Sequence, residues 1–143
     1  MKFHGNYYFL SNFYPSPFRT PKGTLVQTVE HAFQACKTRD ADEQNMVLNA
    51  RTPGDAKRAG RRVQLRHDWG KVKLNIMHQL VALKFEQSPA LAAKLLLTTG
   101  VHLVEDNTWN DTFWGRCNGQ GENHLGRILM QVRHSLTLTN PFR

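Results

Sequence analysis

The sequence predicts a helix-rich α+β fold in a single compact domain over residues 1–143, with a small antiparallel sheet. Apolar residues recur at helical spacing in several stretches after residue 28. Before residue 28, aromatic residues stand among prolines and glycines, which is typical of short strands joined by turns. The length suits one domain with a sizeable core, and no repeat, low-complexity tract or linker divides the chain.

Short strands are expected around residues 7–10 and 24–26, joined through proline-rich turns. A further strand is expected at 101–104, after a helix that ends at Gly100. Residues typical of helix starts mark five helices: Thr28, Asp40, Thr52-Pro53, Asp68 and Ser88-Pro89. The second of these is expected to end near Arg51. Leu125, Ile128, Leu129 and Val132 predict a final helix.

Composition limits the possible partners. The formal net charge is +8, from 19 basic and 11 acidic residues, which favours nucleic acid, a nucleotide or a phosphorylated metabolite without choosing among them. The two cysteines belong to no CxxC pair, the histidines are scattered, and neither a metal nor another cofactor is expected. No long apolar stretch predicts a membrane segment or a signal peptide, so we expect a soluble, cytoplasmic protein.

The stretch Glu105–Gly126, hereafter the tryptophan loop, is long, polar and rich in glycine. Trp109 and Trp114 beside Asp106 and Asp111 are suited to stacking on a flat ring and reading its N–H groups. The glycines would leave backbone N–H groups open to phosphate at the start of the last helix. The alternative is a structured surface loop whose tryptophans cap the core. The residues alone leave both interpretations open.

Two side chains are candidates for chemistry. Glu30 lies beside the apolar face of the first helix, where burial would raise its pKa towards acid/base use. The alternative is an exposed glutamate favoured by the helix dipole. Lys57 stands among Arg58, Arg61 and Arg62, whose charge disfavours its ammonium form, so its amine could be a nucleophile. The alternative is a solvated cationic face, and an intermediate interpretation assigns the arginines to phosphate binding.

Several blocks occur in order along the sequence: FLSNFY (9–14), VEHAFQ (29–34), DAKRAGR (55–61), NTW (107–109) and FWG (113–115), with Gly121, Asn123, Leu125-Gly126 and Leu129-Met130 following. Together these blocks resemble the NADAR family, which includes YbiA-like proteins. The resemblance runs over nearly the whole chain. It implies a helix-rich, YbiA-like α+β domain and an enzyme that cleaves N-glycosidic bonds of ribosides.

The resemblance also implies roles for individual residues. Glu30 would protonate the leaving group or assist ring opening, and Lys57 would trap the ribose carbon as an imine. Ser11, Asn12, Phe13, Trp109, Asp111 and Trp114 would line the sugar and base site, and Arg58, Arg62 and the backbone near Asn123–Gly126 would hold phosphate. Trp69 is a further candidate contact, although its place at the start of a helix favours packing into the core. Glu30 and Lys57 are expected to converge across a pocket roofed by two indoles.

Two functions follow from the resemblance, and a third belongs to a different class of protein. The leading one is an ADP-ribosyl glycohydrolase that removes ADP-ribose from guanine bases in nucleic acid, with an ADP-ribosylating toxin as its genomic partner. The second is an N-glycosidase that hydrolyses phosphorylated riboflavin-biosynthesis intermediates. The third is a module that binds ADP-ribose or related nucleotides without turnover. The charge of +8 favours the first, because nucleic acid is a polyanion.

Overall fold

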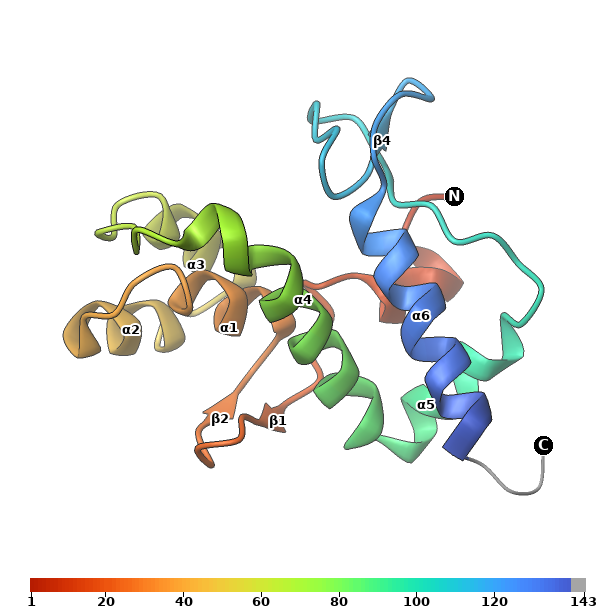
Figure 1. Ribbon diagram of the computed structural model, residues 1–143, viewed down its shortest axis with the longest axis horizontal. Helices are drawn as coiled ribbons and strands as arrows, with labels where there is room; N and C mark the ends of the chain where they lie inside the picture. Colours follow the sequence, from red (N-terminus) through yellow and green to blue (C-terminus); the bar gives the residue numbers. More distant parts are fainter. Residues whose placement is uncertain (140–143) are drawn as a thin grey trace. The chain divides into compact units, whose positions relative to one another are not determined.

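The computed structural model describes residues 1–139, and Figure 1 shows the order of the elements along the chain. The chain divides into two compact units. Asn12–Lys84 forms the first, here called the α1–α4 unit, and residues 1–11 with the chain from Phe85 onward form the second, the α5–α6 unit. The prediction of a single domain over residues 1–143 stays a prediction.

The α1–α4 unit begins with a two-stranded antiparallel hairpin. Strand β1 (Phe18–Arg19) pairs with β2 (Leu25–Val26), so that Phe18 lies opposite Val26 and both are buried. This hairpin confirms the small antiparallel sheet and the strand expected around residues 24–26.

Four helices follow, and each begins where the sequence predicts. They are α1 (Val29–Ala35), α2 (Ala41–Leu48), α3 (Pro53–Gly60) and α4 (Trp69–Glu86). The side chains of Thr28, Asp40 and Thr52 accept the backbone N–H three residues later, which satisfies an otherwise orphaned donor. Helix α4 starts directly after Asp68, whose carboxylate also pairs with Arg66 at 2.6 Å. Helix α2 ends at Leu48, somewhat before Arg51.

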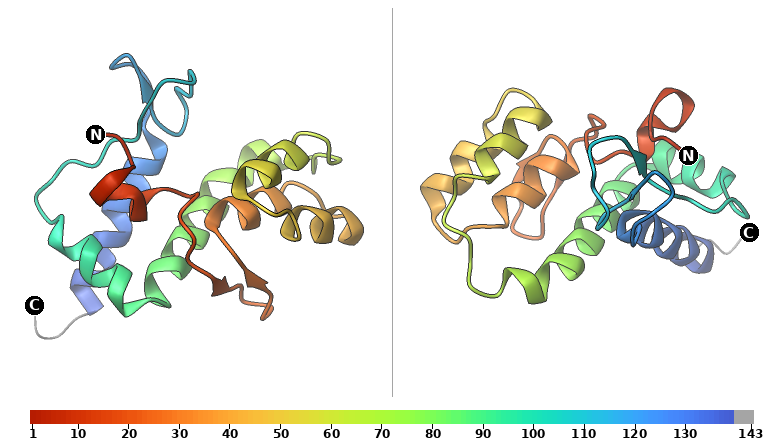
Figure 2. Two further views of the ribbon diagram at one scale, coloured as in Figure 1. Left: turned by 180° about the vertical axis from the view of Figure 1, so that it is seen from behind. Right: turned by 90° about the horizontal axis from the view of Figure 1, so that it is seen from above.

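Helices α1, α2 and α3 lie side by side (Figure 2) and share a small apolar core. Its buried members are Ala35, Val47 and Ala56, with Leu48, Ala50, Ala59 and Val63 packed around them. All seven residues of α1 are buried, including the polar Glu30, His31 and Gln34. Polar groups buried in this way need partners within the protein, so α1 is the helix on which chemistry is most constrained.

Helix α4 carries the buried side chain of Lys84, which is 2% exposed. Its Nζ lies 5.7 Å from the centroid of the Tyr14 ring, within the range of a cation–π contact. Burial lowers the pKa of Lys84 to about 7.

The α5–α6 unit starts with a 3₁₀ helix, η1 (Gly5–Leu10), where a strand was expected around residues 7–10. That expectation is wrong. The neighbouring residues Phe9 and Leu10 are both buried while Tyr7 and Tyr8 are exposed, which does not match the alternation of a strand. Local bonds, such as the one from the N–H of Ser11 to the carbonyl of Tyr8 at 2.9 Å, satisfy the backbone instead.

The rest of this unit contains helices α5 (Pro89–Leu97) and α6 (His124–Thr139), which pack on each other. Leu125, Ile128, Leu129 and Val132 are buried on α6, as the sequence predicts. The strand expected at 101–104 is wrong: the short parallel pair β3 (Asp106–Asn107) and β4 (Arg116–Cys117) lies further along. The carbonyl of Leu103 is taken by the Asn123 side chain at 3.0 Å, rather than by a strand partner.

Overall, the helix-rich α+β fold with a small antiparallel sheet is confirmed, and the parallel pair is an addition that the sequence did not predict. Within residues 1–139, no helix combines the length and the apolar character needed to cross a membrane.

Candidate active site

Glu30 lies in the first turn of α1, and 7% of it is exposed. The Thr28 cap starts the helix, and the backbone N–H of Glu30 donates to the carbonyl of Asn12 at 3.1 Å. The glutamate therefore sits inside the α1–α4 unit, and the exposed alternative does not hold. A carboxyl so placed cannot exchange its partners freely with water, so its neighbours determine its protonation.

Burial is the largest influence on Glu30 and raises the pKa of its carboxyl. Opposing this, the Gln34 Nε2 donates to Glu30 Oε1 at 3.1 Å, and the positive charges of Lys57, Lys37 and His31 also lower the pKa. The net effect of these influences is a raised pKa. A carboxyl with a raised pKa is suited to giving a proton and taking it back near neutral pH.

Lys57 is the first of two amines that the structure brings to this carboxyl. It lies on α3, which packs directly against α1, and its charge acts on Glu30. Ala56 and Gly60 on the same helix are buried small residues, and small residues let two helices approach closely. The structure thus places the two residues singled out for chemistry in one cluster, while the roles assigned to them stay predictions.

Lys37 is the second amine, and the sequence argument did not assign it any chemistry. It follows the end of α1, is half-buried, and lies in the same electrostatic cluster as Glu30 and Lys57. Burial is the main cause that lowers the pKa of its ammonium group. A signal was present in the sequence, because Glu30, Gln34 and Lys37 recur at helical spacing as a polar row on an otherwise buried helix.

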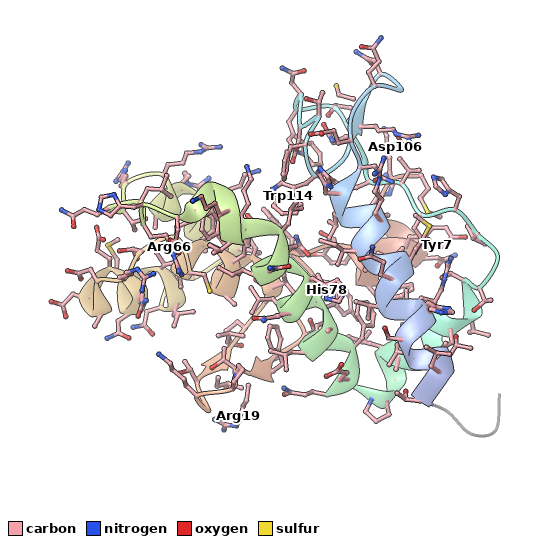
Figure 3. The ribbon with its side chains drawn as sticks, in the orientation of Figure 1. Tyr7, Arg19, Arg66, His78, Asp106 and Trp114 are labelled. Carbon is pink, nitrogen blue, oxygen red and sulfur yellow. The ribbon has the colours of Figure 1, made fainter. Side chains whose placement is uncertain are left out.

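The excess positive charge of the protein is concentrated in the same unit. Residues 12–84 hold 13 of the 19 basic residues and 6 of the 11 acidic ones, a net charge of +7. Of the two arginines assigned to phosphate, Arg58 is exposed and pairs with Asp55 one turn earlier, and Arg62 is exposed just past α3. Arg66 lies between α3 and α4 (Figure 3), where its guanidinium pairs with Asp68.

The block FLSNFY (9–14) contains the boundary between the two units, which falls between Ser11 and Asn12. Ser11 ends η1 in the α5–α6 unit, whereas Asn12 and the half-buried Phe13 open the α1–α4 unit. Asn12 is held at both ends: its carbonyl accepts from the N–H of Glu30, and its Nδ2 lies 3.5 Å from the sulfur of Met77. The backbone of Asn12 is therefore hydrogen-bonded to the backbone of Glu30.

Trp69 opens α4 and is buried. Its ring packs against that of Phe33 on α1, with centroids 5.0 Å apart. This position supports the packing role for Trp69.

The tryptophan loop, which lies in the α5–α6 unit, carries one exposed and one half-buried indole. Trp109 is 60% exposed, whereas Trp114, labelled in Figure 3, packs edge-on against Phe113 with ring centroids 4.8 Å apart. Asp111 accepts from the backbone N–H groups of Phe113 at 3.1 Å and Trp114 at 2.9 Å. Asp111 thereby fixes the backbone that presents Trp114, a role that the sequence did not reveal.

The start of α6 differs from the expected phosphate cradle. The N–H groups of Glu122, Asn123, His124 and Leu125 donate to carbonyls of the tryptophan loop at 2.7–3.2 Å. The expectation of open backbone donors is therefore wrong at these positions, because the loop itself satisfies them. The Asn123 side chain bridges Glu105 and Leu103 at 3.0 Å each, and a Cβ added to Gly126 would lie 2.5 Å from that side chain. Asn123 and Gly126 hold the loop against the helix.

Within residues 1–139, no group of three or more histidine, cysteine or acidic side chains is placed to hold a metal ion.

Fold and cluster together define a small helix-rich α+β protein in which a buried carboxyl on α1 lies within the field of two lysine amines. The family model described as NADAR domain matches residues 2–137, and the chain belongs to the NADAR family. The resemblance seen in the sequence is thus confirmed.

Named relatives refine this assignment. The chain is 41% identical over 140 residues to riboflavin biosynthesis protein VVA0006 of Vibrio vulnificus, covering 96% of this chain and 38% of that protein. It is 38% identical over 131 residues to N-glycosidase YbiA of Escherichia coli, covering 90% of this chain and 81% of YbiA. The NMR structure of E. coli YbiA superposes with a TM-score of 0.86 at 35% identity, over 96% of this chain and 84% of that one. These relatives support an N-glycosidase, and the chain spans about two fifths of the Vibrio protein.

Proposed function

We propose that this protein is an N-glycosidase that cleaves the bond between ribose C1′ and a base nitrogen, and that its substrate is ADP-ribosylated guanine in nucleic acid. The observation that carries the chemistry is the buried carboxyl of Glu30 on α1 within the field of two amines, Lys57 and Lys37. Membership of the NADAR family and relatives named N-glycosidases support the reaction class. The net charge of +7 on residues 12–84 supports a polyanionic substrate.

In the proposed mechanism, Glu30 begins as the neutral acid, a form favoured by its burial. It gives its proton to the ring oxygen, the C1′–O4′ bond breaks, and the base nitrogen forms a double bond with C1′. The nitrogen lone pair of the Lys57 amine adds to C1′. The base nitrogen then leaves, and its bonding pair takes up the proton that the amine has lost.

An imine now joins Lys57 to the open sugar. Water adds to this imine, the carboxylate of Glu30 takes a proton from the water, and the sugar leaves as an aldehyde that can close again. The amine is regenerated, and one water molecule has been consumed for each bond cleaved. Lys37 lies in the same cluster, and its positive charge lowers the pKa of the Glu30 carboxyl.

A second substrate, a phosphorylated ribosylamino-pyrimidine of riboflavin synthesis, is favoured by a separate observation. The Vibrio relative carries the name riboflavin biosynthesis protein and matches 96% of this chain. Both substrates join C1′ to a nitrogen near a guanine-like ring, and both carry phosphate, so the same cluster serves either reaction. Arg58 and Arg62 are proposed to contact phosphate in both cases, since both are exposed on the charged unit.

Trp109, Asp111 and Trp114 stay predicted contacts of the base. An ADP-ribosylating toxin encoded near this gene is the partner that the leading reaction implies. The third function, binding without turnover, needs neither a buried acid nor an amine, so the presence of both Glu30 and Lys57 argues against it.

The deciding experiment offers the purified protein an ADP-ribosylated guanine oligonucleotide and a phosphorylated ribosylamino-pyrimidine in parallel, and measures released sugar at several salt concentrations. We expect faster release from the oligonucleotide, with an apparent affinity that falls steeply as salt rises. Release from the pyrimidine alone would replace the leading substrate with the second one. Binding of ADP-ribose without any release would establish the third function.

A further inference from the structure

The side chain of Gln34 is hydrogen-bonded to the candidate acid, Glu30, and within the part of the chain that the structure describes only one end of its amide has a partner. It lies on α1 one helical turn after Glu30, is 4% exposed, and donates from Nε2 to Glu30 Oε1 at 3.1 Å. The other end of its amide, Oε1, has no hydrogen-bond partner among the described residues. A buried amide left half-satisfied costs free energy, and such groups persist where another state of the site uses them.

The protonated state of Glu30 is the state that would use this oxygen. A carboxylate accepts hydrogen bonds and a carboxylic acid donates one, while an amide offers a donor at one end and an acceptor at the other. A half-turn of the Gln34 amide exchanges those two ends. The same side chain can therefore bond to Glu30 before and after the carboxyl loses its proton, which leucine, methionine or alanine cannot do.

Gly60 explains how the amide is kept in place. It is the buried last residue of α3, and a Cβ built on it would lie 2.8 Å from Cδ and 3.0 Å from Cβ of Gln34. The backbone of α3 therefore packs flat against the Gln34 side chain. Because Lys57 precedes Gly60 by one turn on α3, this contact also sets how closely the amine-bearing helix approaches the acid-bearing one.

We infer that Gln34, clamped by Gly60, is the positioning residue of the Glu30 carboxyl: its amide donates to the carboxylate and accepts from the protonated acid. This inference rests on the proposed function, in which Glu30 is the acid and base. Gln34 itself contacts no substrate in this scheme and acts through Glu30.

The charged groups around Glu30 define what else influences its titration. Lys57 on α3, Lys37 after α1 and His31 on α1 act on it directly. Helix α2 also packs on α1 and carries two acidic residues: Asp42 is exposed, and Glu43 accepts bonds from Thr38 and Gln64. Helix α4 packs on α1 through Trp69 and Phe33 and carries Lys73, whose charge acts on Lys37. Strand β2 contributes Leu25 and Val26, which do not titrate.

The test is an NMR titration of the protein labelled with ¹³C at glutamate carboxyls, in which the Glu30 signal is the one missing from Glu30→Gln. Replacing Gln34 by methionine removes a hydrogen bond that is stronger to the charged carboxylate than to the neutral acid. The pH at which half of Glu30 is protonated, here called the Glu30 midpoint, should therefore rise. Gln44→Met is the matched control, because Gln44 donates to the Thr38 carbonyl at 2.8 Å on α2. In the unsubstituted protein, the Gln34 side-chain amide signals should shift with the Glu30 midpoint.

An unchanged Glu30 midpoint in Gln34→Met, or Gln34 amide signals that ignore the titration, would overturn the inference. The kinetic counterpart is a lower kcat and a displaced pH profile with little change in KM. The titration does not depend on turnover, so it tests the positioning role of Gln34 independently of the proposed function. If Glu30→Gln retained activity, the proposed function would fall while the midpoint shift stood.

A second pair of variants keeps the inference testable if Gln34→Met folds poorly. Glycine to alanine within a helix normally stabilises it, so Gly54→Ala on α3, whose added Cβ would meet only ordinary contacts at 3.7 Å or more, should hold or raise the melting temperature. Gly60→Ala should lower the melting temperature by several degrees and disturb the Glu30 midpoint. Adding Gln34→Ser should relieve the lowered melting temperature. Equal stability of Gly60→Ala and Gly54→Ala would contradict the clamp.

Discussion

The cluster on α1 and α3 and the tryptophan loop are built by different means. The cluster sits on two regular helices that each begin at a threonine cap, and its side chains Glu30 and Gln34 are hydrogen-bonded to each other. In the loop, side chains such as Asp111 and Asn123 are consumed in holding the backbone. The loop also contains three asparagines with positive φ: Asn110, Asn118 and Asn123.

The two regions therefore have different requirements. A carboxyl with a raised pKa needs a fixed, buried place, and a well-packed helix provides one. A surface that presents aromatic rings needs a fixed backbone, and the loop obtains this from side chain to backbone bonds. Polar residues therefore act as candidates for catalysis in the first region and as structural ties in the second.

The largest expected effect of a substitution in the cluster is at Glu30. Glu30→Gln should lower turnover roughly a hundredfold or more, because it removes the acid and base, while nucleotide binding persists. It should also raise the free energy of unfolding at pH 7. The folded pKa of Glu30 lies above its ordinary value, so the unsubstituted protein loses stability as pH rises through that window, and the glutamine variant does not.

Sugar release and denaturant unfolding at pH 5 and pH 7 measure both effects. Glu122→Gln, an exposed acid in the tryptophan loop, is the matched control and should change neither. Turnover preserved in Glu30→Gln would remove the catalytic role of the carboxyl.

In the loop, the corresponding change is Asn123→Ala, and its effect should fall on stability. It removes two buried hydrogen bonds, to Leu103 and Glu105, at a cost of about 2–4 kcal/mol. Asn75→Ala, at an exposed position of α4, should stay within about 0.5 kcal/mol. Urea unfolding monitored by circular dichroism gives both values. Equal costs for the two variants would mean that the Asn123 bridge does not hold the loop.

Lys84 provides a pH test of burial in the α1–α4 unit. Its folded pKa of about 7 lies below the ordinary 10.5, so the unfolded chain binds more protons between these values and stability should rise with pH there. The slope approaches about 1.4 kcal/mol per pH unit within that window. Unfolding measured from pH 7 to 9.5 should show this rise in the unsubstituted protein and lose it in Lys84→Met. The same slope in both proteins would show that Lys84 remains charged.

The smallest expected effects lie at the two indoles. If the loop presents Trp114 to the base, Trp114→Leu should raise KM several-fold with little change in kcat, because base stacking contributes about 1–3 kcal/mol. Trp109→Leu should have a weaker effect, since the ring is already mostly exposed. Steady-state kinetics on the oligonucleotide measure both. An unchanged KM in both variants would favour the alternative of a structured surface loop that does not contact the base.

The two regions also differ in how far the sequence predicted them. The helix starts at Thr28, Asp40 and Thr52 were predicted because capping depends on a few adjacent residues. A signal for the cluster is also present in the sequence, because Glu30, Gln34 and Lys37 recur at helical spacing. The hydrogen bonds that satisfy the backbone N–H groups at the start of α6 could not be predicted, because their partners are backbone carbonyls, which every residue carries. The 3₁₀ helix at residues 5–10 was missed because aromatic content favoured a strand.

The clamp on Gln34 was equally invisible in the sequence, since it depends on how α3 meets α1 in space. The partner of Gly60 lies on a different helix, so the residues next to Gly60 in the sequence do not reveal it. Long-range contacts of this kind are fixed by packing and not by local pattern.

The most direct test of the central claim is mass spectrometry of the protein after borohydride reduction during turnover. An imine between the sugar and an amine of the cluster would be reduced to a stable adduct. We predict that the adduct maps to Lys57, is absent from Lys57→Ala, and persists in the control Lys71→Ala. Turnover at the normal rate with no adduct on Lys57 or Lys37, or full activity in Lys57→Ala, would contradict the account.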